Sequence, residues 1–262
     1  MNQVVSSLFV YPIKSLAGIS VFQAKALKAG FENDRRWMLL DENNGFVTQR
    51  NLPQMALFIP EIREKFLSVH YNNENISFDL SETTGEIIIT KVFDDAAETL
   101  MVSNRANEWF SDQLNRKIKL VKIKSEQSRN HYSTLKHIDI PVSLADGYPY
   151  LLTGEISLYN LNTKLEKSIP MNRFRPNIVV TTTVPHEEDL WENISIGNAI
   201  FKNMKPCGRC TIVTIDQATG IINNETLKVL NTYRKSGNSV LFGTNMMCTK
   251  EGLVSVGDSI KF

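Results

Sequence analysis

The stretch of this sequence with the clearest chemical potential is KPCGRCT, residues 205–211, because it spaces Cys207 and Cys210 as Cys-x-x-Cys. Such a pair can act as a disulfide redox pair, as half of a zinc site, or as the source of a thiolate ligand for another metal group. The residues that surround the pair, together with the third cysteine, Cys248, decide how well each interpretation fits.

The context of the pair weakens the first two interpretations. A thioredoxin-type pair begins a helix whose dipole activates the thiol, whereas Cys210 is followed by the mostly β-branched residues TIVTID, which predict a strand. Structural zinc needs four ligands, and only Cys248 remains. Two cysteines packed in a turn remain possible. So does a thiolate that completes the shell of a metal cofactor, and this last interpretation requires a pocket for the rest of the cofactor.

Basic residues in the first half of the chain could contribute to such a pocket. The motif YPIKS places Lys14 and Ser15 at the end of a first predicted strand, and NDRRW places Arg35 and Arg36 where a second strand begins. Lone surface cations usually face solvent, so these residues indicate an anion site only if the fold brings them together.

The motif NRFRPNIVV sets Arg173, Arg175 and Asn177 around Pro176, just before an apolar strand. Arginine offers a planar fork that suits a phosphate or the amide and carbonyl edge of a heterocycle. Together with the basic residues of the first half, this motif describes a local anion site.

The composition is that of an ordinary globular protein with almost no net charge. The chain has 262 residues, 42% of them hydrophobic, and 29 Lys and Arg against 28 Asp and Glu give a formal net charge of +1. This length suits one large domain or two small ones. Because there is no global field to attract nucleic acid or an anionic membrane, we expect neither as a partner.

Cysteine content and the first residues bear on location. Three cysteines are too few for a disulfide framework, and their odd number favours a reducing compartment. The start, MNQVVSSLFVYPIKS, lacks the basic residues and continuous apolar run of a signal peptide, and nowhere do about 18 apolar residues run together. The expected location is cytoplasmic.

The first half of the chain reads as a compact β-rich unit, expected at residues 1–100. Short runs such as VVSSLFV, RWMLLDE and EIIITKV are separated by Gly, Asn and Asp. A helix and linker are expected over residues 101–140. Ser103 is a candidate N-cap for a helix in SNRANEWFSDQLN, and the polar stretch 124–147 reads as a long loop or linker.

Residues 141–262 are expected to form a second β-rich unit. A short strand leads into a helix that begins near Thr153 or Gly154, and a further helix is predicted around ETLKVLNTYRK. Many short strands with few helices favour a mainly β fold (β with α+β character) built from barrel-like units, rather than a doubly wound parallel sheet.

The ordered set YPIKS, DRRW, ADGYPYLLTGEISL, NRFRPNIVV, KPCGRCTIVTID, LFG and VGD resembles the MOSC family with its N-terminal partner domain, as in YcbX-type proteins and the mitochondrial amidoxime-reducing component. The resemblance implies an N-terminal β-rich domain joined to a MOSC β-barrel. It also implies the molybdenum cofactor, molybdenum carried by molybdopterin, and the family's label of pyridoxal phosphate binding.

The resemblance also implies roles for particular residues. Cys210 would be the metal ligand and the catalytic thiolate, while Cys207 would be structural. The residues assigned to the cofactor's phosphate are Lys14, Ser15 and Arg35, and those assigned to its pterin are Gly147, Tyr148, Arg175, Asn177 and Gly208.

The implied activity is the reduction of N-hydroxylated compounds from N–O to N–H. YcbX-type proteins continue into a ferredoxin domain, whereas this sequence ends at VGDSIKF with three cysteines. Electrons are therefore expected from a separate donor, a ferredoxin-like or cytochrome b5-like protein with its reductase.

Two alternatives remain: a molybdenum cofactor carrier or sulfuration protein without its own turnover, and a scaffold that has lost its cofactor. Cys210, Lys14 and Arg35 count against the scaffold.

Overall fold

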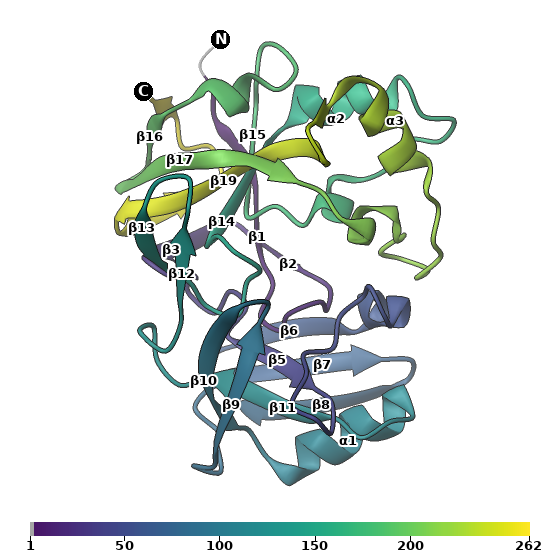
Figure 1. Ribbon diagram of the computed structural model, residues 1–262. Coiled ribbons are helices and arrows are strands. Elements are labelled where there is room, and N and C mark those ends of the chain that lie inside the picture. The colour runs from purple at the N-terminus through teal and green to yellow at the C-terminus, as the bar shows by residue number, and fades with distance from the viewer. Residues whose placement is uncertain (1–2) are drawn as a thin grey trace.

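The computed structural model describes residues 3–262, in which many short strands and three α-helices form two stacked lobes (Figure 1). The upper lobe of Figure 1 contains the first strands, the C-terminal strands and helices α2 and α3, and the lower lobe contains the strands from β5 to β11 and helix α1. The predicted mainly β fold, an N-terminal β-rich domain plus a MOSC barrel with few helices, is confirmed.

The upper lobe is built on one large sheet in the order β2-β1-β15-β14-β19-β17-β16-β21, in which β14 and β15 run parallel and the other neighbours antiparallel. Its strands are β1 (Val5–Val10), β2 (Ile19–Val21), β14 (Tyr150–Gly154), β15 (Ile178–Val180), β16 (Asn193–Ile196), β17 (Ala199–Gly208), β19 (Ser239–Lys250) and β21 (Ile260–Lys261), with β18 (Lys235–Ser236) paired to β19.

A small second sheet closes over this one and encloses the upper core. Its strands, in the order β20-β3-β4, are β20 (Gly252–Ser255), β3 (Gln23–Leu27) and β4 (Gly30–Phe31). Leu8, Phe201 and Met246 of the large sheet are fully buried against Ala26 and Phe31 of the small one. Alternating burial along β1 and β3 produces this apolar face, as expected for strands with one side on a core.

The lower lobe combines two sheets with helix α1 (Asn104–Leu114). The predicted cap is confirmed, because the Ser103 hydroxyl accepts a hydrogen bond from Ala106 N. Phe110 of the helix lies in the lower core against Phe58. The strands are β5 (Trp37–Leu40), β11 (Lys119–Ile123), β10 (Asp95–Met101) and β9 (Ile87–Val92) in one sheet, and β6 (Ile59–Arg63), β7 (Phe66–Tyr71) and β8 (Glu74–Asp79) in the other.

Two further helices and most of the short 3-10 helices pack together beside the large sheet. Both helices were predicted, and the Thr153 or Gly154 start is confirmed because Gly154 is the N-cap of α2. Their shared cluster contains Leu161, Val213, Leu230 and Phe242. The helical segments are α2 (Glu155–Asn162), α3 (Glu225–Tyr233), η1 (Pro53–Leu57, in the lower lobe), η2 (Met171–Phe174), η3 (Glu187–Leu190) and η4 (Thr211–Thr214).

The strand predicted after Cys210 is wrong, because Cys210 is followed directly by the 3-10 helix η4. Val213 is fully buried in the cluster around α2 and α3, and the Thr214 hydroxyl donates to Thr211 O at 2.7 Å. Burial of Val213 therefore outweighs the β-propensity of the branched side chains, which depends on context.

The polar stretch 124–147, expected as a long loop or linker, contains a β-hairpin of β12 (Asn130–Ser133) and β13 (Ile138–Pro141). Arg129 enters this hairpin with its side chain almost completely buried, and its guanidinium donates to Asp95 and to backbone carbonyls. The segment is ordered by these polar contacts together with the burial of Ile140, Val142 and Leu144.

The division of the sequence at residues 100 and 140 stays a prediction. The structure adds that β1 to β4, although they begin the chain, belong to the upper lobe with the C-terminal strands. The chain therefore passes from the upper lobe to the lower one and back, which places several loops at the junction (Figure 1).

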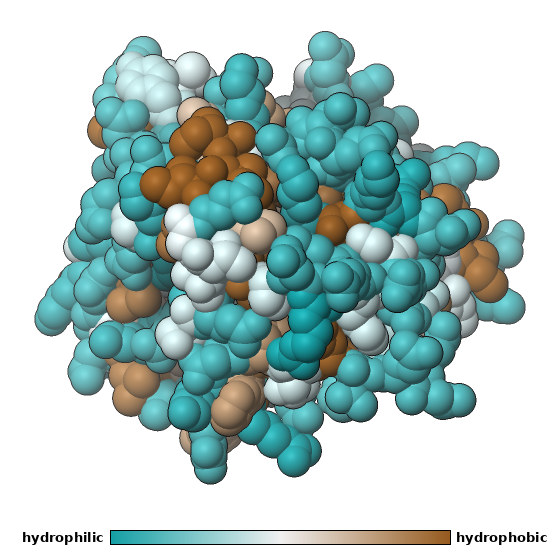
Figure 2. Space-filling model, turned by 90° about the horizontal axis from the view of Figure 1, so that it is seen from below, coloured by the Kyte–Doolittle hydropathy of each residue, from teal (hydrophilic) through white to brown (hydrophobic). Residues whose placement is uncertain are grey.

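The surface seen from the lower lobe is mostly hydrophilic but carries a coherent apolar patch (Figure 2). The large apolar side chains exposed in this lobe are Ile59, Phe66, Ile87, Ile89 and Phe93. Among residues 3–262, no helix has both the length and the apolar character needed to cross a membrane.

Gly243 in β19 offers a test of the packing at the centre of the large sheet. Its φ is +69°, and an added Cβ would lie 2.7 Å from Leu152 O. Gly237 has a similar φ of +55° but open space around it. We expect Gly237→Ala to lower the free energy of unfolding by about 1 kcal/mol, and Gly243→Ala by roughly 1–3 kcal/mol more, because backbone must move. Urea unfolding of both variants measures this, and equal losses would contradict it.

Candidate functional site

Backbone contacts bring two motifs side by side, YPIKS at residues 11–15 and NDRRW at residues 33–37. Ile13 and Trp37 form a parallel bridge, Lys14 N donates to Trp37 O at 2.8 Å, and Arg35 N donates to Tyr11 O at 2.7 Å. Ser15 and Arg35 both take positive φ, 67° and 47°. β1 has already ended at Val10 and β5 begins only at Trp37, so both residues lie in left-handed turns outside the strands. The side chains of YPIKS and NDRRW therefore converge.

They converge on a hollow of about 850 Å³ at the junction of the two lobes. Loops from both lobes line it: Phe93 and Asp95 belong to the lower lobe, and Arg175 and Tyr148 to the upper. The sequence-predicted site residues on its wall are Lys14, Ser15, Arg35, Gly147, Tyr148, Arg175, Asn177, Gly208 and Cys210, which is the whole predicted set.

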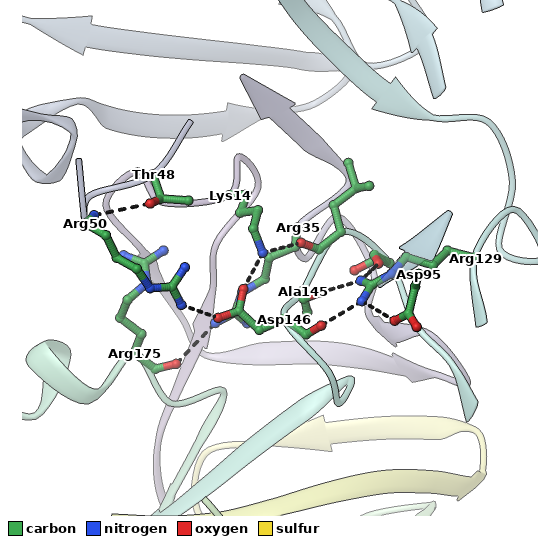
Figure 3. Close-up of polar contacts among 11 residues, drawn as sticks. Lys14, Arg35, Thr48, Arg50, Asp95, Arg129, Ala145, Asp146 and Arg175 are labelled. Carbon is green, nitrogen blue, oxygen red and sulfur yellow. Dashed lines mark hydrogen bonds and ion pairs between the residues drawn. The ribbon is translucent and has the colours of Figure 1, made fainter. Parts of the chain in front are cut away.

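One end of the hollow is strongly cationic. Lys14 Nζ, almost fully buried, forms an ion pair with one oxygen of Asp146 and donates to Leu144 O at 2.9 Å, and Arg50 Nη2 donates to the other Asp146 oxygen at 2.8 Å (Figure 3). Burial lowers the pKa of Lys14 to about 8 despite the nearby carboxylate. Burial alone would raise the pKa of Asp146, but Lys14 and Arg50 hold it well below its usual range.

Arg129 fixes the backbone that carries Asp146. Its guanidinium donates to Ser143 O at 2.8 Å, to Ala145 O and to Asp146 O at 2.6 Å, and it pairs with Asp95 at 2.8 Å. Burial lowers the pKa of Arg129, although Asp95 opposes this. The loop is held from behind while the Asp146 side chain keeps 49% of its surface exposed in the hollow.

A stack of two arginines on Tyr11 forms the next part of the wall. The guanidinium carbons of Arg35 and Arg175 lie 4.2 and 4.3 Å from the centroid of the buried Tyr11 ring, a cation–π arrangement. Burial raises the pKa of Tyr11 to about 12, although both arginines oppose this, and burial lowers the pKa of Arg175 to about 10. Buried Nη1 of Arg175 has no hydrogen-bond partner among the described residues.

Arg35 is already paired within the protein. It donates to Asp34 Oδ2 at 2.6 Å, to Asn177 Oδ1 at 2.9 Å and to Arg175 O at 3.2 Å. The Asn177 amide also donates to Phe9 O at 3.3 Å. Asn177 thus orients Arg35, and its predicted role as a pterin contact stays a prediction.

The cysteines lie at another part of the same wall. Cys210 is exposed and precedes η4, whereas Cys207 is half-buried and accepts a contact from Arg209 Nη1 at 3.0 Å. Burial alone would lower the pKa of Arg50, but attraction to Asp146 and to the Cys210 sulfur raises it. Arg50 therefore lies between the cationic end and Cys210.

The rim near Gly147 and Gly208 is polar and aromatic. Lys205 Nζ lies 5.2 Å from the centroid of the Tyr148 ring, and the centroids of the Tyr148 and His131 rings lie 5.3 Å apart in an edge-on arrangement. His131 Nδ1 lies 3.2 Å from Asp95 Oδ2. A flat ligand could lie along this rim.

Sequence reasoning missed four residues of the site. Asp146 and Arg209 stood inside the quoted motifs, so their charge beside glycine and cysteine was an available signal. No sequence signal marked Arg50 or Arg129, because neither residue belongs to a recognised motif. Conversely, Arg36 and Arg173 pair with Glu126 at 3.2 Å and with Asp216 at 2.8 Å, outside the wall of the hollow.

The arrangement argues against a zinc centre. Cys248 is buried in the upper core, away from the other two cysteines. Within residues 3–262, no group of three or more His, Cys, Asp or Glu is arranged to hold a metal ion. A metal here would need most of its ligands from a larger cofactor.

The hollow fits such a cofactor. Its volume of about 850 Å³ lies within the roughly 300–1,000 Å³ of small-molecule and cofactor sites, which favour domain junctions. The cationic end suits a phosphate, and exposed Cys210 offers a soft ligand. Arg175 Nη1 is buried and has no partner within residues 3–262, so it needs an acceptor.

Known proteins show the same two-part organisation. Residues 2–117 match the MOSC N-terminal beta barrel domain and residues 139–261 match the MOSC domain. The chain is 31% identical to mitochondrial amidoxime reducing component 2 of Bos taurus, covering 98% of this chain and 82% of that protein. It is 29% identical to mitochondrial amidoxime-reducing component 1 of Danio rerio, with 98% and 84% covered. It is 30% identical to molybdenum cofactor sulfurase of Arabidopsis thaliana, covering 91% of this chain but 32% of that protein.

The buried ammonium of Lys14 predicts a pH dependence of stability. Its pKa is about 8 in the folded protein against 10.5 ordinarily, so between these values the unfolded chain holds a proton that the folded protein has released. The free energy of unfolding therefore rises with pH across this window, and the contribution is lost as pH falls through about 8.

We expect the difference in unfolding free energy, wild type minus Lys14→Met, to rise by roughly 3 kcal/mol across the window. Asp146 does not interfere, because its pKa is held far below this range. Urea unfolding of both proteins at several pH values measures the difference, and a flat or falling one would show that Lys14 is not titrating as described.

Proposed function

The chain belongs to the family whose members join a MOSC N-terminal β-barrel domain to a MOSC domain, and from this premise we propose that it binds the molybdenum cofactor in the hollow and reduces N-hydroxylated compounds from N–O to N–H. The single observation that carries the proposal is that all nine residues assigned by the sequence motifs line one hollow. The names of the similar proteins support the choice of substrate class.

The chain's own residues divide the work of binding. Lys14, Ser15 and Arg50 face the cationic end and would hold the cofactor's phosphate, because cations and hydroxyls bind phosphate through charge-assisted hydrogen bonds. Arg175 would offer its Nη1, which has no hydrogen-bond partner among residues 3–262, to the cofactor. Arg35 donates hydrogen bonds to Asp34 and Asn177. It would therefore have a structural role in addition to its predicted contact with the phosphate.

Cys210 would supply the protein thiolate that ligates molybdenum. When bound, the cofactor supplies two electrons, so that one N–OH group and two protons give one N–H group and one water. The protein's part is to orient this group and surround it with fixed charges. Arg50, which lies between Cys210 and Asp146, keeps the sulfur beside a cation.

Electrons would come from a separate protein, ferredoxin-like or cytochrome b5-like. Of the chain's three cysteines, Cys207 and Cys210 lie in the hollow and Cys248 in the core, so four thiolates cannot gather around a [2Fe–2S] cluster. The proposed location is the cytoplasm, on the grounds of cysteine content given above.

A molybdenum cofactor carrier or sulfuration protein is the second candidate. It is favoured by the likeness to molybdenum cofactor sulfurases of Arabidopsis thaliana and Bos taurus, each at 30% identity over more than nine-tenths of this chain. Binding by the same hollow is common to both candidates. Turnover distinguishes them.

Cys210→Ser and Cys207→Ser form a matched pair that tests the metal ligand. In protein from a host that makes the cofactor, we expect Cys210→Ser to abolish benzamidoxime reduction and change the molybdenum spectrum, because the exposed thiolate is lost. Cys207→Ser should keep most activity, because its sulfur contacts Arg209. Molybdenum content and pterin fluorescence are measured in parallel. The opposite ranking would move the ligand to Cys207.

Electron supply can be tested with the purified chain. We expect reduced viologen to support reduction of benzamidoxime, whereas NAD(P)H alone should fail until a reductase and carrier are added. Direct turnover with NAD(P)H would refute the need for a separate donor. Full molybdenum occupancy without turnover on viologen would favour the carrier.

A further inference from the structure

The Asp146 carboxylate forms ion pairs with Lys14 and Arg50, the two cations best placed to bind an anionic ligand. One of its oxygens pairs with Lys14 Nζ, and the other accepts from Arg50 Nη2 at 2.8 Å (Figure 3). We propose that Asp146 is an internal competing anion, which a phosphate group must displace from Lys14 and Arg50 when it binds. The proposal deepens the phosphate-binding role given above and rests on it.

The geometry lets this carboxylate move without the rest of the loop. Arg129 holds the carbonyls of Ser143, Ala145 and Asp146, and Lys14 also holds Leu144 O. The backbone is therefore fixed from behind. The Asp146 side chain remains 49% exposed, so rotation about its own bonds is enough to release both cations.

The remaining groups favour a dianion over the carboxylate. Asp146 carries one negative charge and two oxygens, whereas Lys14, Arg50 and Arg175 supply three positive charges. Buried Nη1 of Arg175 has no partner among the described residues. A tetrahedral phosphate has enough oxygens and charge to serve all three, and Arg175 lies close enough to Asp146 to feel its charge.

Competition of this kind lowers the affinity of the protein for free anions while keeping the cations paired. Two buried or partly buried cations left without a counter-charge would be costly. Asp146 prevents that cost in the ligand-free protein. A ligand must then offer more than a carboxylate does, which favours a phosphate carried on a larger group over a small monoanion.

Removal of the competing charge tests the proposal on metal-free protein. We expect Asp146→Asn to bind inorganic sulfate, a dianion whose charge is constant near pH 6, at least tenfold more tightly than wild type, the equivalent of about one charge-assisted hydrogen bond. At about pH 6, Lys14 keeps its proton. Isothermal calorimetry in low-chloride buffer measures the affinity.

Asp94→Asn is the matched control. Asp94 is exposed on the wall of the same hollow and makes no ion pair with another described residue. The same change of charge there should alter sulfate affinity by less than about twofold, because long-range attraction through water is weak. Equal gains in both variants would show a general field rather than competition, and would overturn the proposal.

Wild-type protein provides a second measurement if Asp146→Asn does not fold. Saturating sulfate should shift the ¹³C signal of the Asp146 carboxyl group, because Lys14 and Arg50 leave it. Sulfate binding with no such shift would overturn the proposal, and so would unchanged or weaker sulfate binding by folded Asp146→Asn. None of these readouts needs molybdenum or turnover, so a failure of the proposed reductase function can be distinguished from a failure of the proposal that Asp146 competes with bound anions.

Discussion

The structure depends on keeping several cations away from water at the junction of its two lobes. Arg129, Lys14 and Arg175 are 1%, 4% and 9% exposed, and each has to exchange hydration for contacts with the protein. Carboxylates and backbone carbonyls replace that water: Asp95 for Arg129, Asp146 for Lys14, and a tyrosine ring for Arg175. Buried charges of this kind are tolerated only where such partners are in place. The loops that carry the partners are therefore held by these contacts.

This constraint also creates the binding site. Lys14 and Arg175 are held in position by contacts behind them, so apart from the proposed displacement of Asp146 they need no rearrangement to meet an anion, which is the condition for electrostatic preorganisation. Contributions come from both lobes, because Arg50 and Asp95 approach from the lower one and Arg175 and Cys210 from the upper one, while Lys14 lies between Ile13 and Leu16, which are buried in the lower core. A ligand in the hollow would tie the lobes together, and its binding free energy would add to the stability of the fold.

The wall of this one hollow combines parts of different chemical character. A cationic end, an arginine pair on Tyr11 and an exposed cysteine follow one another on its wall. Asp146 and Arg50 link the two ends, since Arg50 lies beside both the carboxylate and the Cys210 sulfur.

The sequence by itself determined the mainly β fold, the three helices with the Ser103 cap, and the identity of nine residues on the wall of the hollow. The fold, the helices and the cap follow from local periodicity and capping chemistry, which are properties of neighbouring residues, and the nine residues follow from the resemblance of the ordered motifs to the MOSC family. Only the tertiary structure decided that Thr211–Thr214 is a 3-10 helix and that 124–147 contains a hairpin, because burial of Val213 and of Arg129 depends on distant segments. It alone showed Arg50 and Asp146 as partners, since residues 96 positions apart meet there. An ion pair between such distant residues leaves no periodic trace in the sequence.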